Sequence, residues 1–103
     1  MNDTPDTSNS VEGRVVIVTG GGTGIGRAYA KHFAAHGAIP VIAEINGQAG
    51  SSVATEIEAA GGRALAIQTD VSDEESVAEM IGRAMEEFGR IDVLLNNAAI
   101  FST

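Results

Sequence analysis

The chain has 103 residues, enough for one small domain, and its 44% hydrophobic and 19% charged residues are typical of a globular protein. Its net charge of −8 argues against binding to the phosphates of DNA or RNA. The chain has no cysteine and no apolar run of the roughly 20 residues that span a bilayer, which excludes disulfides and thiolate chemistry and predicts a cytoplasmic protein with no membrane partner.

Residues 1–12 are predicted to form a disordered tail, because their first ten positions are mostly polar and carry no targeting pattern. From residue 13 onward, short apolar runs alternate with helical patterns. Strands are predicted over residues 14–19, 39–45, 63–69 and 91–96, and helices over residues 24–36, 48–60 and from about 73 to 88.

Local signals sharpen the helix predictions. Gly37, the pair at 61–62 and Gly89 follow the three helices, as glycines past a helix C-terminus do. Ser72 and Glu75 match a capping box that would open the third helix with Ser72 as the N-cap. In the first helix the apolar positions tend to one face, namely Ile25, Ala28, Tyr29, Phe33 and Ala34.

The alternation β-α-β-α-β-α-β predicts an α/β fold with a parallel sheet covered on both faces. Right-handed crossovers place the first two helices on one face of the sheet. If the fourth strand returns beside the first, the strand order is 3-2-1-4, which is the first half of a Rossmann-type doubly wound sheet.

The most informative segment joins the first strand to the first helix. The apolar run over residues 14–19 enters a glycine-rich turn, which is how proteins offer backbone N–H groups and a helix N-terminus to a diphosphate. Gly20 allows a sharp exit from the strand, while Gly24 and Gly26 leave room for a cofactor and for close packing of the helix. The alternative, a glycine-rich turn without a ligand, is disfavoured by this position in a parallel sheet.

Residues 19–26, T-G-G-G-T-G-I-G, resemble the T-G-x-x-x-G-I/L-G signature of the short-chain dehydrogenase/reductase family. In that family the turn wraps the diphosphate and adenosine side of NAD or NADP. The resemblance implies that the turn lines the cofactor through Gly20, Gly21, Gly22, Thr23, Gly24, Ile25 and Gly26.

Glu44 ends the second predicted strand, eighteen residues after Gly26. A carboxylate at about this spacing accepts hydrogen bonds from the adenosine ribose and repels a 2′-phosphate. Family members that prefer NADP often carry a basic residue where this chain has Thr23, Ile45 and Asn46. We therefore expect NAD to be preferred over NADP, the alternative being that Glu44 is a solvated residue at a strand end.

Asp70 and Val71 follow the third predicted strand and resemble the family's Asp-Val pair. The resemblance implies that the Asp70 carboxylate accepts from the adenine amino group and that the Val71 backbone contacts the ring. A capping segment before the third helix explains the same residues equally well.

Residues 96–99, N-N-A-A, follow the fourth strand and resemble the family's N-N-A-G segment. The resemblance implies that Asn96 braces the sheet, while Asn97 and Ala98 lie along the ribose and nicotinamide side of the cofactor. Ala99, also expected at the cofactor, stands where glycine is usual, and its methyl group is tolerated only with a negative φ or a more distant cofactor.

In the family, the catalytic Ser, Tyr and Lys follow this last segment, and we assign no catalytic residue and no metal ligand in this chain. We expect the cofactor-binding half of an NAD(P)-dependent oxidoreductase that is inactive alone. The complete protein would act on an alcohol or carbonyl substrate and form homo-oligomers. Without a further strand beside it, the apolar strand at 91–96 would be an unpaired edge of the sheet, which is a second reason to expect a longer protein. The alternative is a truncated module that binds a nucleotide or a partner without catalysis.

Overall fold

The computed structural model describes residues 10–97, so residues 1–9 of the predicted tail, with Ala98 and Ala99, lie outside the described residues. The elements in this range are β1 (Val15–Thr19), α1 (Gly24–Ala35), β2 (Ile39–Glu44), α2 (Gly47–Ala59), β3 (Leu65–Gln68), α3 (Glu74–Phe88) and β4 (Val93–Leu95). Their order is the predicted β-α-β-α-β-α-β.

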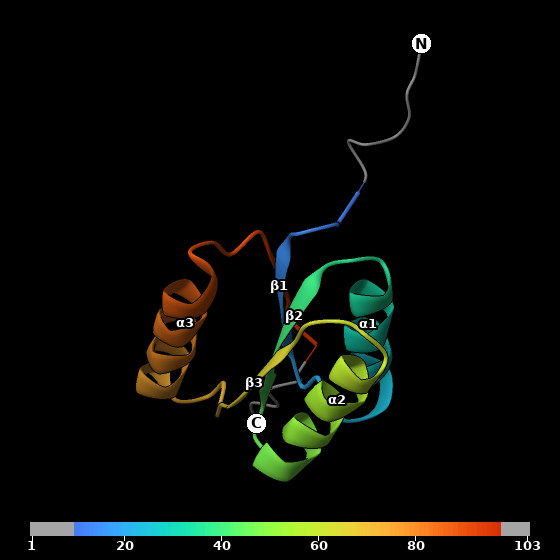
Figure 1. Cartoon of the computed structure of the whole chain (residues 1–103). Helices are drawn as coiled ribbons and strands as arrows, with labels where there is room; N and C mark the ends of the chain where they lie inside the picture. Colours follow the sequence, from blue (N-terminus) through green and yellow to red (C-terminus); the bar gives the residue numbers. More distant parts are fainter. Residues whose placement is uncertain (1–9, 98–103) are drawn as a thin grey trace.

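The four strands form one parallel sheet in the order β3-β2-β1-β4, as predicted. The two crossovers through α1 and α2 cover one face of the sheet, and α3 covers the other (Figure 1). Val15 to Val18 of β1 are at most 2% exposed, because side chains on both faces of this central strand are covered by helices.

Alternate side chains of the central strands supply two separate cores. The core under α3 consists of Val15, Ile17, Ile39, Val41, Ala43, Ile67, Met80 and Ala84. The core under α1 and α2 consists of Val16, Val18, Ala30, Ala38, Ile42, Val53 and Ile57. Because all four strands run parallel, their carboxyl ends lie at one edge of the sheet.

The predicted apolar face of α1 is wrong over its first two turns. Ile25 and Tyr29 are 60% and 38% exposed, and Ala28 is exposed as well. The face that packs inward consists of Gly26, Ala30, Phe33 and Ala34. The beginning of α1 lies so close to β1 that a Cβ on Gly26 would collide with the carbonyl oxygen of Gly20. Only small residues fit at this approach, and the larger side chains face outward.

The predicted capping box of α3 is also wrong. Asp73 is the N-cap, and its carboxylate accepts a hydrogen bond from the Glu75 backbone N–H at 3.0 Å. The Ser72 hydroxyl instead donates to the Asp70 carboxylate at 2.6 Å. Because Ser72 is held in the turn after β3, the helix begins one residue later than predicted.

Candidate cofactor-binding site

The four segments singled out in the sequence follow the four strands at the same edge of the sheet. The glycine turn follows β1, Glu44 ends β2, Asp70 comes shortly after β3, and Asn96 with Asn97 follows β4. In an open parallel sheet, this carboxyl edge is where ligands bind, at the point where the strand order reverses. Here the strand order reverses between β1 and β4. The helices α1 and α2 cover one face of the sheet, and α3 covers the other (Figure 1).

The glycine turn is tied to the neighbouring strand and adopts a conformation that favours glycine. The Gly20 backbone N–H donates to the Ala43 carbonyl of β2 at 2.8 Å, and Gly20 has a φ of 68°. A Cβ on Gly21 would lie 3.0 Å from Cγ2 of Ile42. The turn therefore packs closely against the edge of the sheet.

The N-terminus of α1 has no side-chain cap. Thr23 is the N-cap residue, yet its side chain makes no capping hydrogen bond, and the first turn of the helix holds no acidic residue. The first N–H groups of a helix need a partner and favour negative charge. This helix end is therefore suited to bind an anion such as a diphosphate.

Glu44 is buried beside the glycine turn. It is 7% exposed, and its Oε1 accepts a hydrogen bond from the Gly22 backbone N–H at 2.9 Å. Its Oε2 accepts from the Asn46 backbone N–H at 3.1 Å. Glu44 is therefore not a solvated residue at a strand end, and its charge lies at the turn that would receive a cofactor.

Asp70 shapes the turn between β3 and α3. Its carboxylate accepts from both the hydroxyl and the backbone N–H of Ser72, and these two hydrogen bonds lower the pKa of Asp70. Its own backbone N–H donates to the Ser76 hydroxyl at 2.9 Å. Since Asp73 caps α3, Asp70 is not the helix cap, and its carboxylate is held by Ser72 in the turn at the carboxyl edge of the sheet.

Thr19 joins the end of β1 to the end of β4. Its hydroxyl donates to Oδ1 of Asn96 at 3.1 Å and accepts from the Asn97 backbone N–H at 2.8 Å. The Asn97 side-chain amide donates to the Gly20 carbonyl at 3.4 Å. We did not assign Thr19 from the sequence, although its place as the first residue of the glycine signature was a signal for it.

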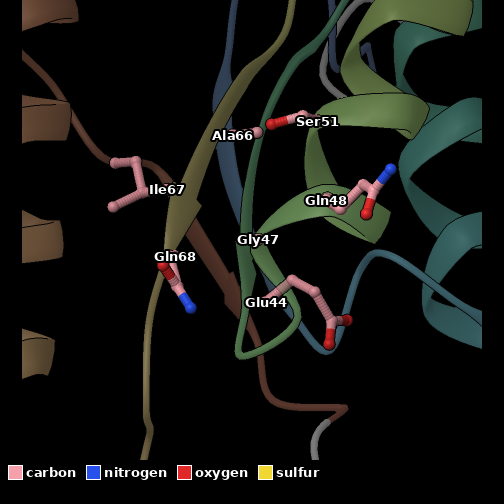
Figure 2. Close-up of a pocket in the computed structure, with 8 residues that line it drawn as sticks. Glu44, Gly47, Gln48, Ser51, Ala66, Ile67 and Gln68 are labelled. Carbon is pink, nitrogen blue, oxygen red and sulfur yellow. The ribbon is translucent and has the colours of Figure 1, made fainter.

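Cavities lined by described residues border this edge. One of about 250 Å³ lies on the α3 face and is lined mostly by apolar side chains, with Thr19 and Asn96 as its polar lining residues. Another, of about 410 Å³, lies between α2 and β3, where Ser51 faces Ala66 (Figure 2). Glu44 lines this second cavity from the end of β2, with Gln48 and Gln68 nearby.

Within residues 10–97, no group of three or more His, Asp or Glu side chains could hold a metal ion. The rings of His32 and His36, at the C-terminal end of α1, have centroids 4.4 Å apart and are tilted by 42°, but they have no third ligand in this range. Over the same range, no helix is long and apolar enough to cross a membrane.

Known proteins are similar to this chain in both sequence and fold. A family model described as short chain dehydrogenase matches residues 14–103. The chain is 48% identical over 92 residues to an L-rhamnose 1-dehydrogenase (NAD(P)(+)) of a Sphingomonas species, covering 87% of this chain and 36% of that protein. It is 45% identical over 89 residues to a meso-2,3-butanediol dehydrogenase of Serratia marcescens, covering 86% of this chain and 35% of that protein.

Solved structures of dehydrogenases have the same fold as this chain. A hydroxysteroid dehydrogenase from Escherichia coli superposes with a TM-score of 0.86 at 36% identity, covering 91% of this chain and 40% of that one. A short chain dehydrogenase from Mycobacterium avium superposes with a TM-score of 0.84 at 48% identity, covering 90% of this chain and 35% of that one. The chain thus spans little more than a third of the length of the proteins that it matches.

Proposed function

The chain belongs to the short-chain dehydrogenase family, and from that premise we propose that residues 13–103 form the NAD-binding half of an oxidoreductase. The observation that carries the proposal is the meeting of an uncapped helix N-terminus with a buried carboxylate on one glycine turn. NAD, when bound, supplies the acceptor or donor of a hydride. The residues described here bind and orient it.

The diphosphate is proposed to lie on the glycine turn, over Gly20 to Gly26. The close packing at Gly26, where a Cβ would collide with the Gly20 carbonyl, keeps the start of α1 against the turn. The N-terminus of α1 supplies N–H groups and a favourable dipole. Backbone N–H donors can stabilise an anion here by hydrogen bonding without a basic side chain, which suits an acidic protein.

The adenosine end is proposed to lie between Glu44 and the turn after β3. Glu44 would accept from the ribose hydroxyls, and Asp70 with Val71 would contact the adenine ring. A 2′-phosphate would meet a buried carboxylate, and like charges placed together in a binding site cost several kcal/mol. The burial of Glu44 therefore supports NAD over NADP.

The nicotinamide end is proposed to lie along Asn97, Ala98 and Ala99. Asn97 is already held against the glycine turn by its bond to the Gly20 carbonyl. This contact would hold the nicotinamide end of the proposed track beside the diphosphate on the glycine turn. The cofactor would then cross the sheet from β3 to β4.

Hydride transfer itself is proposed for a protein of the relatives' length, acting on a small alcohol or carbonyl compound and assembled as a homo-oligomer. The chain's one tyrosine, Tyr29, lies on the exposed face of α1. Lys31 lies two residues further on and forms an ion pair with Glu56 at 3.4 Å. This observation favours a second candidate for the 103 residues taken alone, a nucleotide-binding module without catalysis.

Titration with NADH and NADPH tests the proposal. We expect NADH to bind with a rise in its fluorescence, and NADPH to bind roughly tenfold more weakly or worse. Gly26→Ala should abolish binding because its Cβ collides with the Gly20 carbonyl. The matched control is Gly82→Ala on α3, where a Cβ meets nothing within 4 Å.

Three outcomes would count against parts of the proposal. A folded protein that binds neither nucleotide contradicts cofactor binding. Equal binding by Gly26→Ala and the unmodified protein contradicts the placement of the site. Equal affinity for NADH and NADPH contradicts the role given to Glu44.

A further inference from the structure

We propose that Glu44 is also a positioning residue, which holds the glycine turn in its binding conformation before any cofactor arrives. The inference rests on the proposed function, since it assigns a second role to the carboxylate that would select NAD. Its consequence is that cofactor preference and turn geometry depend on one side chain and change together.

The two oxygens of Glu44 bind two separate backbone segments. Oε1 accepts from Gly22 in the turn after β1, and Oε2 accepts from Asn46 in the turn before α2. Gly22 lies twenty-two residues before Glu44 in the chain. The carboxylate thus fastens the turn after β1 to the turn before α2.

Packing makes this contact hard to replace. A Cβ on Gly22 would lie 2.8 Å from Cγ of Glu44 and 3.0 Å from Ala49 at the start of α2. The Gly22 N–H is therefore enclosed against the Glu44 side chain. A buried N–H that loses its acceptor costs free energy, and charge-assisted bonds are the stronger kind.

The remaining hydrogen-bonding capacity of Glu44 is compatible with a ribose. A carboxylate offers about four acceptor positions, and the two backbone donors take two of them. Two hydroxyl groups can therefore bind without releasing Gly22 or Asn46. The turn is already organised when the cofactor binds, which lowers the cost of ordering it.

A basic residue at position 44 would then have two effects. It would remove the charge that repels a 2′-phosphate, and it would also leave Gly22 and Asn46 without their acceptor. The neighbouring position differs, because the Ile45 side chain is 60% exposed. A positive charge at 45 can attract a phosphate while the Glu44 bonds stay intact.

Amide hydrogen exchange in the absence of nucleotide tests the inference. We compare the unmodified protein with Glu44→Asp, which is one methylene too short to reach Gly22, and with Glu44→Gln, which keeps the shape but loses one acceptor. The matched control is Ile45→Arg. We expect Gly22 to exchange about tenfold faster or more in Glu44→Asp. In Glu44→Gln the backbone amide of either Gly22 or Asn46 should exchange faster by a similar factor. Ile45→Arg should leave the exchange rates of both amides unchanged.

A second readout separates positioning from general damage to the fold. Ile45→Arg should bind NADPH more tightly than the unmodified protein does, while Glu44→Arg should lose affinity for both nucleotides. Unchanged exchange at Gly22 and Asn46 in both Glu44→Asp and Glu44→Gln would overturn the inference. So would a Glu44→Arg protein that binds NADPH as tightly as Ile45→Arg does.

Failure of this inference is distinguishable from failure of the proposed function. The exchange measurement uses no cofactor, so it reports on the Glu44 contacts alone. A protein that binds no nucleotide but shows the exchange differences would refute cofactor binding and retain the positioning role. Normal NADH binding with unchanged exchange would refute the positioning role and retain cofactor binding.

Discussion

The Asn97 backbone N–H donates to the Thr19 hydroxyl at 2.8 Å, across 78 residues of sequence. The same hydroxyl donates to Oδ1 of Asn96. Thr19 is 5% exposed, so these hydrogen bonds form in a part of the protein that water hardly reaches. The end of β4, where the nicotinamide is proposed to lie, is thereby held against the end of β1, where the glycine turn begins.

Thr19→Val keeps the shape of the side chain and removes its hydroxyl. It leaves the Asn97 N–H and the Asn96 carbonyl without this partner, so we expect a loss of about 1–3 kcal/mol in the free energy of unfolding. Urea unfolding measures the loss. Thr19→Ser keeps the hydroxyl and should retain most of the stability. Equal stability of the Val and Ser variants would show that the hydroxyl contributes little.

A second link between β1 and the start of β4 depends on pH. The Asp92 carboxylate pairs with Arg90 at 2.7 Å and accepts from the Val15 backbone N–H at 2.8 Å. The hydrogen bond from Arg90, followed by that from Val15, lowers the pKa of Asp92. A carboxylate with a lowered pKa in the folded state stabilises the protein above the pKa of the unfolded state. That contribution is lost as the pH falls through the folded pKa.

Asp92→Asn should therefore destabilise the protein at neutral pH and cost progressively less as the pH falls below about 4, the ordinary pKa of an aspartate. Urea unfolding at several pH values measures the difference. Glu86→Gln, at an exposed position of α3, is the control for the loss of one carboxylate. A constant difference between Asp92→Asn and the unmodified protein at all pH values would contradict this account.

The order of the elements was predictable because strong local signals separate them. Gly37, Gly61 and Gly89 have φ values of 87°, 93° and 74°, which favour glycine and end the three helices where the sequence indicated. The strands were recognisable as short apolar runs between these stops. The carboxyl ends of parallel strands then had to meet at one edge, which brought the four predicted site segments together.

The contacts that define the site could not be predicted in the same way. The hydrogen bonds that Gly22 donates to Glu44 and Asn97 donates to Thr19 join positions 22 and 78 residues apart. No local sequence pattern encodes such contacts. The start of α3 was misplaced because Ser72 had two possible partners, and Asp70 competed with the helix for it. The strand β4 is shorter than the predicted strand at 91–96, because its pairing reaches only Val16 to Val18 of β1.

The misjudged face of α1 leads to a direct test with two alanines of the same helix. Ala30 is fully buried, while Ala28 is exposed. Ala30→Leu inserts a large side chain into a packed core and should cost about 1–3 kcal/mol. Ala28→Leu makes the same change on the outer face and should change stability by less than about 0.5 kcal/mol. Thermal unfolding of the two variants decides, and a larger loss for Ala28→Leu would restore the face predicted from the sequence.

The last prediction concerns the outer edge of β4. Among the residues that the structure describes, β4 pairs with β1 alone, and Leu94 is 62% exposed beside it. An apolar strand edge of this kind can pair with another chain. When the 103 residues are produced as printed, we expect self-association that rises with concentration in sedimentation experiments. Leu94→Lys should shift the protein toward the monomer, because a charge on the edge opposes pairing. Arg83→Ala, on exposed α3, is the control for a change of surface charge, and an equal shift in both variants would mean that association does not use this edge.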